Sequence, residues 1–118
     1  MYEDNVKAQM RKGVLEYCIM SVLMTGDAYA SDIIRRLKEA ELIVVEGTLY
    51  PLLTRLKNAG LLNYRWEEST QGPPRKYYML TDEGRRILAD LDKSWHDMVE
   101  TVERLRTQAQ STSTQVKP

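Results

Sequence analysis

The clearest structural pattern of the chain lies in residues 46–80, which read EGTLYPLLTRLKNAGLLNYRWEESTQGPPRKYYML. The first half of this segment has the spacing of one apolar helical face, set by Leu49, Leu52, Leu53 and Leu56. Gly60 follows at a place where a helix commonly ends. Because proline is tolerated only in the first turn of a helix, Pro51 predicts an N-cap at Gly47 or Thr48.

The second half of this segment alternates between apolar and polar side chains. Leu62, Tyr64 and Trp66 occupy every other position, and residues 75–80 form another extended run after the turn-rich residues 69–74. Period-two alternation on both sides of a turn predicts a β-hairpin. We therefore expect one helix followed directly by a hairpin.

Helical patterns flank this segment on both sides. Residues 5–24 contain no proline and place apolar side chains on adjoining helical faces, and residues 30–40 form a second amphipathic pattern. After the hairpin, Thr81 has the position of an N-cap, and a last helix extends to Arg106. This order predicts a mainly α protein with a small β-hairpin (α+β), a winged helix-turn-helix with a long C-terminal helix.

The chain is expected to form one compact unit with a tail. Its 118 residues are the length of a single domain. We expect residues 1–80 to form the winged helix-turn-helix and residues 81–106 to form the C-terminal helix of the same unit. The polar residues 107–118 are expected to be disordered.

The last helix carries the seam of a coiled coil. Its apolar residues are separated alternately by three and four positions: Leu88, Leu91, Trp95, Met98, Val102 and Leu105. One small domain has no surface left to cover such a seam. The pattern therefore predicts a homodimer held mainly by the last helix, packed against the first helix of the partner.

Composition excludes several classes of protein. Seventeen Lys and Arg balance seventeen Asp and Glu, which argues against a nonspecific binder of polyanions. Cys18 is the only cysteine and His96 the only histidine, so the sequence offers no metal-ligand spacing, and no cofactor is expected. No signal peptide or membrane-spanning run is present, so we expect residence in the cytoplasm. Since no catalytic motif occurs either, the chain is not expected to be an enzyme.

The third helix and the hairpin tip carry side chains suited to DNA. The outward face of the helix is expected to present Thr48, Pro51, Thr54, Arg55 and Asn58. The hairpin tip joins Gly72 and two prolines to Arg75 and Lys76, which can lie along a phosphate backbone. No carboxylate occurs from residue 47 to residue 66. DNA binding is the prediction, and the alternative is a winged-helix module that docks another protein on the same face.

Three motifs carry a family resemblance: residues 46–56 (EGTLYPLLTRL), residues 60–62 (GLL) and residues 72–81 (GPPRKYYMLT). Together they closely resemble the PadR family of bacterial transcription regulators. The resemblance covers about residues 10–106 and points to the small subclass with a single C-terminal helix. It implies a ligand-responsive repressor that binds a pseudo-palindromic, double-stranded operator as a homodimer. The DNA-facing positions that it implies are Tyr29, Thr48, Tyr50, Pro51, Arg55, Gly72, Arg75 and Lys76.

Trp95 has two interpretations. A tryptophan is too bulky for tight packing at a seam position, which leaves room for a cavity. The resemblance implies that Trp95 stacks a planar aromatic or phenolic effector at the dimer centre, with Met98 and Val99 as the walls of the pocket. The alternative is that Trp95 is part of the core of the dimer interface.

Overall fold

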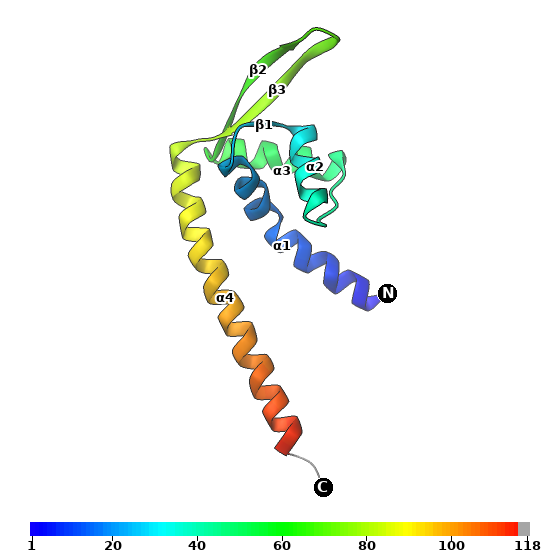
Figure 1. Cartoon of the computed structure of the whole chain (residues 1–118), viewed down its shortest axis with the longest axis vertical. Helices are drawn as coiled ribbons and strands as arrows, with labels where there is room; N and C mark the ends of the chain where they lie inside the picture. The colour runs from blue at the N-terminus through cyan, green and yellow to red at the C-terminus, as the bar shows by residue number, and fades with distance from the viewer. Residues whose placement is uncertain (116–118) are drawn as a thin grey trace. The chain divides into compact units, whose positions relative to one another are not determined.

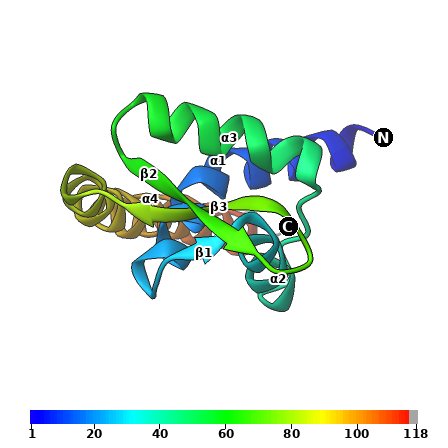
Figure 2. The same ribbon diagram turned by 90° about the horizontal axis from the view of Figure 1, so that it is seen from above.

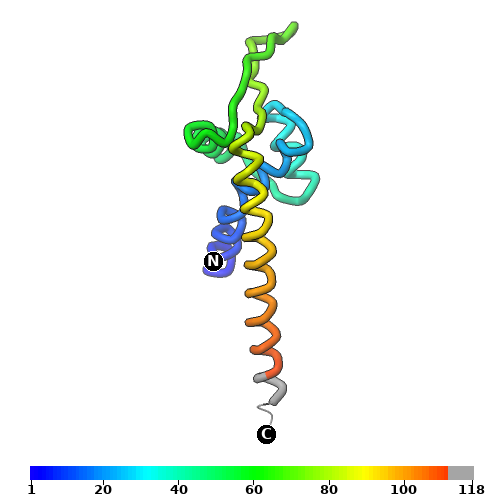
Figure 3. The backbone as a smooth tube through the Cα atoms, turned by 90° about the vertical axis from the view of Figure 1, so that its left-hand side faces the viewer, coloured from blue at the N-terminus to red at the C-terminus, as the bar shows by residue number. Residues whose placement is uncertain are grey.

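The computed structural model describes the backbone of residues 1–115 and has four helices and three strands (Figure 1). In chain order they are α1 (Tyr2–Met24), β1 (Ala28–Tyr29), α2 (Ala30–Glu39), α3 (Glu46–Asn58), β2 (Leu62–Ser69), β3 (Gly72–Leu80) and α4 (Asp82–Gln115). The predicted fold class, mainly helical with a small antiparallel sheet and a long last helix, is confirmed. The hairpin of β2 and β3 extends beyond α2 and α3 (Figures 1 and 3).

The chain divides into two compact units, and the division falls inside α4. The first unit is Met1–Leu88 and the second begins at Ala89. The first turns of α4 therefore belong to the same unit as the winged helix-turn-helix. Helix α4 also continues to Gln115 instead of ending at Arg106, since residues 107–115 contain neither glycine nor proline to stop it. Residues 116–118 of the expected tail lie outside the described residues.

The core of the first unit is built from the apolar faces that the sequence pattern identifies. Leucine side chains of α3 face inward, with Leu49 and Leu53 fully buried. Ile19 of α1, Ile33 of α2 and Leu62 of β2 are buried as well and complete the core. Each fully buried side chain of this size contributes roughly 1.5 to 3 kcal/mol. This core fixes α3 and the base of the hairpin.

Helix α3 begins earlier than Pro51 predicts. Val45 is the N-cap, and the N–H groups of Thr48 and Leu49 both donate to its carbonyl at 3.0 Å. Pro51 thus lies inside the helix, beyond the first turn, and the predicted cap at Gly47 or Thr48 is wrong. The structure tolerates this position because Gly47 and Pro51 are both exposed, so that water can bind the carbonyl that lacks its N–H partner.

The hairpin turn is shorter than predicted. Strand pairing runs from Leu62 opposite Leu80 to Ser69 opposite Gly72, so only Thr70 and Gln71 lie between the strands. The two prolines after Gly72 belong to β3 instead of to the turn. They fit there because this end of β3 pairs with β2 alone, which leaves a free edge where no N–H donor is needed.

The sheet has a third strand that the sequence did not predict. Ala28 pairs with Tyr78 and Tyr29 with Tyr77, which places β3 between β1 and β2 (Figure 2). A strand of two residues has no periodicity of its own, and its pairing depends on a segment far along the chain. Its effect is to join the start of α2 to the base of the hairpin.

The start of α4 is fixed by Thr81, as predicted. The Thr81 Oγ1 atom accepts from the N–H of Gly84 at 2.9 Å and donates to the Gly60 carbonyl at 2.7 Å. Gly84 lies against the chain that precedes β2, where an added Cβ would come within 2.1 Å of the Leu61 carbonyl oxygen. Only glycine allows α4 to approach this backbone so closely.

Candidate nucleic-acid interface

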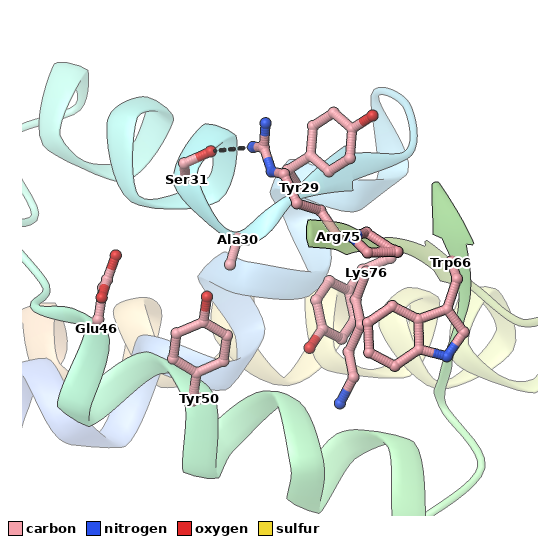
Figure 4. Close-up of a pocket in the computed structure, with 10 residues that line it drawn as sticks. Tyr29, Ala30, Ser31, Glu46, Tyr50, Trp66, Arg75 and Lys76 are labelled. Carbon is pink, nitrogen blue, oxygen red and sulfur yellow. Dashed lines mark hydrogen bonds between the residues drawn. The ribbon is translucent and has the colours of Figure 1, made fainter. Parts of the chain in front are cut away.

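A pocket of about 350 Å³ lies between the hairpin, the start of α2 and the first turns of α3 (Figure 4). Its lining is Tyr29, Ala30, Ser31, Glu46, Tyr50, Trp66, Pro74, Arg75, Lys76 and Tyr78. Four of the eight positions that the resemblance implies for DNA contact, namely Tyr29, Tyr50, Arg75 and Lys76, are therefore together. The folding of the first unit brings these residues close from three distant segments of the sequence.

Arg75 lies at the α2 side of the pocket. Its guanidinium is centred 3.9 Å from the middle of the Tyr29 ring, and its Nη2 donates to Ser31 Oγ at 2.8 Å (Figure 4). The Tyr29 ring in turn packs edge-on against Tyr77 at 4.8 Å between centroids. A cation on an aromatic face is held without losing its charge. Arg75 is therefore oriented, and its remaining N–H groups can bind an anion.

Lys76 lies on the opposite face of the hairpin and points toward α3 (Figure 4). Its Nζ is 4.5 Å from the centre of the Tyr64 ring and 5.5 Å from the Trp66 ring. Lys57 of α3 approaches the same tyrosine at 5.5 Å. Among the described residues, neither Arg75 nor Lys76 forms an ion pair. The positive charges of these two side chains are therefore available to an anion.

Trp66 belongs to this site, although it was not predicted as a site residue. Its side chain is 61% exposed, packs edge-on against Tyr64 and lines the pocket. The signal was available in the alternation of β2, which places both rings on one face of the hairpin. An exposed tryptophan beside Lys76 is an apolar surface feature of the kind that marks a binding site.

Arg65 differs from the cations of the pocket. Its Nε donates to Glu67 at 2.7 Å, its Nη1 lies 3.7 Å from Asp27, and its guanidinium covers the Tyr77 ring at 4.6 Å. The hydrogen bond to Glu67 is the main reason that the pKa of Arg65 is raised. The positive charge of Arg65 is thus compensated within the protein.

The other predicted positions do not join the pocket. Thr48 lies on the opposite side of α3, where it borders a shallower pocket lined by α1 and the loop before α3. Pro51 is exposed on the helix surface, and Gly72 stands at the hairpin tip. Contact with all of these positions would require an extended partner that spans α3 and the hairpin.

Arg55 is paired with a carboxylate that the sequence argument overlooked. The guanidinium donates to both carboxylate oxygens of Glu16 in α1, and this hydrogen bonding is the main cause of its raised pKa. Residues 47–66 contain no carboxylate that could pair with Arg55, but the fold brings in a carboxylate from α1. Residue spacing on α3 gives no information about α1.

The apolar stripe of α4 is shorter than predicted. Leu88 is 5% exposed and belongs to the core of the first unit, so its assignment to the dimer seam is wrong. In the second unit Leu91 is half-buried. The apolar side chains beyond it, all at least 40% exposed, are Trp95, Met98, Val99, Val102 and Leu105.

Other functional chemistry has little support. Among the described residues, no three His, Cys, Asp or Glu side chains are close enough to hold a metal ion. Partial burial raises the pKa of the Cys18 thiol, which fits a small apolar side chain better than a reactive one. Within residues 1–115, no helix is both long enough and apolar enough to span a membrane.

Three helices followed by a hairpin that projects beside the third helix define a winged helix-turn-helix protein. Residues 19–90 match the model of the transcriptional regulator PadR-like family, which is more than half of the chain. The chain belongs to this family, as its motifs predicted, and is a transcription regulator and not an enzyme.

Solved structures of the same family are closely similar. A PadR-like transcription factor from Bacteroides fragilis is 67% identical, with a TM-score of 0.74 over 86% of this chain and 98% of that one. A PadR-like regulator from Bacillus cereus is 37% identical, with a TM-score of 0.71 over 82% and 95%. A PadR family regulator from Eggerthella lenta is 35% identical, with a TM-score of 0.75 over 88% and 94%.

Proposed function

We propose that this regulator is a homodimeric repressor that places α3 in the major groove of its operator and the hairpin on the adjacent phosphate backbone. The observation that supports this most is the pocket between hairpin and α3. Arg75 and Lys76 lie at its two sides, each against an aromatic ring; neither forms an ion pair among the described residues, and the Glu46 carboxylate also lines the pocket. Oriented cations flanking a concave face suit the phosphates of a duplex.

The exposed face of α3 fits this placement. The exposed face of the helix carries Tyr50 and Arg55, and its other exposed residues include Gly47, Pro51, Thr54 and Asn58. Small and uncharged polar side chains allow a helix to approach base edges closely. Tyr50, which is 45% exposed, would contact the sugar-phosphate backbone nearest the hairpin.

The exposed stripe of α4 supports the dimer. Met98, Val102 and Leu105 are large apolar side chains of α4 that are 47% to 60% exposed. A second copy of the chain offers the same stripe, so a two-fold interface would bury both. The two-fold symmetry would be matched by a pseudo-palindromic operator, and the repressor would act in the cytoplasm with its DNA.

The effector site is proposed on the exposed side chains of α4. Trp95, Met98 and Val99 lie on adjoining positions of α4 and would surround the dimer axis. A planar aromatic or phenolic molecule stacked on Trp95 would then release the operator. The second interpretation, in which Trp95 is part of the interface core, predicts the same burial of Trp95 in the dimer without a ligand.

DNA binding is tested by the salt dependence of affinity for a duplex that carries the promoter of the regulator's own operon. Arg75→Ala and Lys76→Ala should weaken binding to specific and random DNA alike, and each should reduce the slope of log affinity against log salt by about one. Lys93→Ala, which removes a lysine from an i,i+4 pair with Asp97 on α4, is the control and should leave the slope unchanged.

Two results would contradict the proposal. If wild-type protein bound no duplex more tightly than random DNA at physiological salt, the face of α3 would not read an operator. The winged-helix module that docks another protein would then be the better description. If the hairpin variants and Lys93→Ala lowered the slope equally, the pocket would have no special role.

A further inference from the structure

Glu16 and Arg55 connect α1 to the exposed face of α3. Both carboxylate oxygens take part, because Oε2 accepts from Nε at 3.4 Å and Oε1 accepts from Nη2. The residues are 39 positions apart in sequence, so the pair exists only in the folded first unit. Surface ion pairs of this kind contribute little to stability. A contribution to folding therefore does not account for the pair, and a role in function does.

The pair uses one particular edge of the guanidinium. A guanidinium has five N–H donors in a fixed plane. Nε and Nη2 form its side edge, and both point at Glu16. The end edge, formed by the other N–H of Nη2 and those of Nη1, remains available for a second acceptor pair. Guanine presents such a pair in the major groove, the N7 and O6 atoms.

Glu16 is well placed to fix this side chain. Its neighbours on α1, Leu15 and Ile19, are buried at 6% and 0% exposure, so the backbone that carries the carboxylate is part of the core. The Glu16 side chain is 34% exposed and that of Arg55 66%. Arg55 is thus held at its Cα by α3 and at its guanidinium by α1. Side-chain freedom lost before binding does not have to be lost on binding.

We propose that Glu16 is a positioning residue for base recognition, which holds Arg55 by one edge of its guanidinium so that the other edge binds a guanine of the operator. The inference rests on the proposed function, in which α3 enters the major groove. It adds a residue of α1 to the determinants of sequence preference. It also predicts that removing a negative charge from the DNA-facing unit weakens recognition, the reverse of simple electrostatics.

The chain offers a matched control in the pair of Arg65 and Glu67. The Glu67 side chain is 35% exposed, nearly the same as Glu16, and accepts from its arginine Nε at 2.7 Å. This pair lies on the hairpin face that carries Tyr77, so it does not touch α3. Glu67→Gln therefore removes the same charge from a similar pair without altering Arg55.

The experiment is selection of binding sites from random duplex DNA by wild type, Arg55→Ala, Glu16→Gln and Glu67→Gln. Wild type should select a guanine at one position of each half-site. Arg55→Ala should lower the preference for this guanine by about fivefold to 150-fold, the range of one bidentate contact, and Glu16→Gln should lower it by at least about threefold. Glu67→Gln should keep the wild-type preference.

Further variants separate positioning from a structural role. Glu16→Asp keeps the charge but withdraws the carboxylate from the guanidinium, so it should lose the same preference. In the Arg55→Ala background, Glu16→Gln should have no additional effect on that base pair. Thermal melting by circular dichroism shows that each variant is folded, and fluorescence anisotropy on the selected duplex measures each affinity.

The possible failures are distinguishable. If wild type selects no motif, the proposed function fails and this inference falls with it. If wild type selects a motif that Glu16→Gln also selects with unchanged preference, or that Arg55→Ala leaves intact, only the inference is overturned. If Glu16→Gln binds every sequence more tightly, then Glu16 competes with DNA for Arg55, and the positioning role is wrong.

Discussion

The first unit, Met1–Leu88, has a core of buried apolar side chains from its helices and its sheet, whereas the large apolar side chains of α4 from Trp95 to Leu105 are exposed. Leu53 of α3 is fully buried, while Leu105 of α4 is 60% exposed. Both belong to amphipathic helices whose apolar residues are spaced three or four positions apart. The same helical pattern therefore occurs on a face that is buried within the chain and on a face that a second copy of the chain would bury.

Shortening one leucine in each unit tests whether the buried face and the exposed face differ in their contribution to stability. Leu53→Ala should lower the free energy of unfolding by about 2 to 5 kcal/mol, because it leaves a cavity in a closed core. Leu105→Ala should change the stability of the monomer by less than about 0.5 kcal/mol. Urea denaturation at several protein concentrations measures both effects.

The concentration dependence supplies the control. A loss of dimer stability shifts the urea midpoint of Leu105→Ala only where wild type is dimeric, whereas Leu53→Ala shifts it at every concentration. Equal shifts for both variants at the lowest concentration would mean that α4 is covered within one chain. The proposed dimer interface would then lose its main support.

Trp95→Ala tests whether Trp95 on the exposed face of α4 binds an effector or forms part of the core of a dimer interface. If Trp95 stacks a ligand, the variant should lose about 1 to 3 kcal/mol of affinity for a phenanthridinium dye, a range taken from aromatic stacking on bases, and should keep its DNA affinity. Fluorescence anisotropy of the dye measures the affinity of both proteins. Quenching of Trp95 emission, in a Trp66→Tyr background because Trp66 is also exposed, reports stacking in the protein that keeps Trp95.

The interface-core interpretation gives the opposite pattern. Analytical ultracentrifugation should then show that Trp95→Ala sediments as a monomer, and no planar dye should quench Trp95 in the parent protein. One ligand per dimer is the expected stoichiometry of a true site, because a site on a two-fold axis can be filled only once.

Two glycines of the first unit test how closely other atoms approach the helix backbone at each position. Gly84→Ala should destabilise the protein by about 1 to 3 kcal/mol, since the new Cβ would meet the Leu61 carbonyl oxygen. Gly13 lies inside α1 with nothing within 4 Å of a Cβ, so Gly13→Ala should stabilise it by about 0.5 to 1 kcal/mol. Thermal melts of the two variants, compared with wild type, should move in opposite directions.

The sequence predicted the features that rest on local periodicity. The apolar faces of α2 and α3 and the alternation of the hairpin gave the right elements, and Thr81 was correctly identified as a cap. Four of the predicted site residues proved to line one pocket. These features depend on residues close together in the chain, where spacing fixes geometry.

What the sequence could not give depends on contacts between distant segments. Strand β1 has two residues and exists only through its pairing with Tyr77 and Tyr78. Glu16 and Arg55 are 39 positions apart and pair only in the folded chain, and Leu88 is buried because the first turns of α4 join the core. The start of α3 was predicted too late, because the sequence does not distinguish an exposed proline inside a helix from a proline in its first turn.

The ladder between β1 and β3 has a consequence for how rigid the hairpin is. A two-stranded hairpin is barely stable alone and can swing on its base, but here a third strand ties it to the residue that begins α2. The width between Tyr29 and the base of the hairpin is therefore set during folding. A duplex that bridges α2, α3 and the hairpin would meet a template of constant span, and sequences whose groove width matches that span would need the least bending to fit.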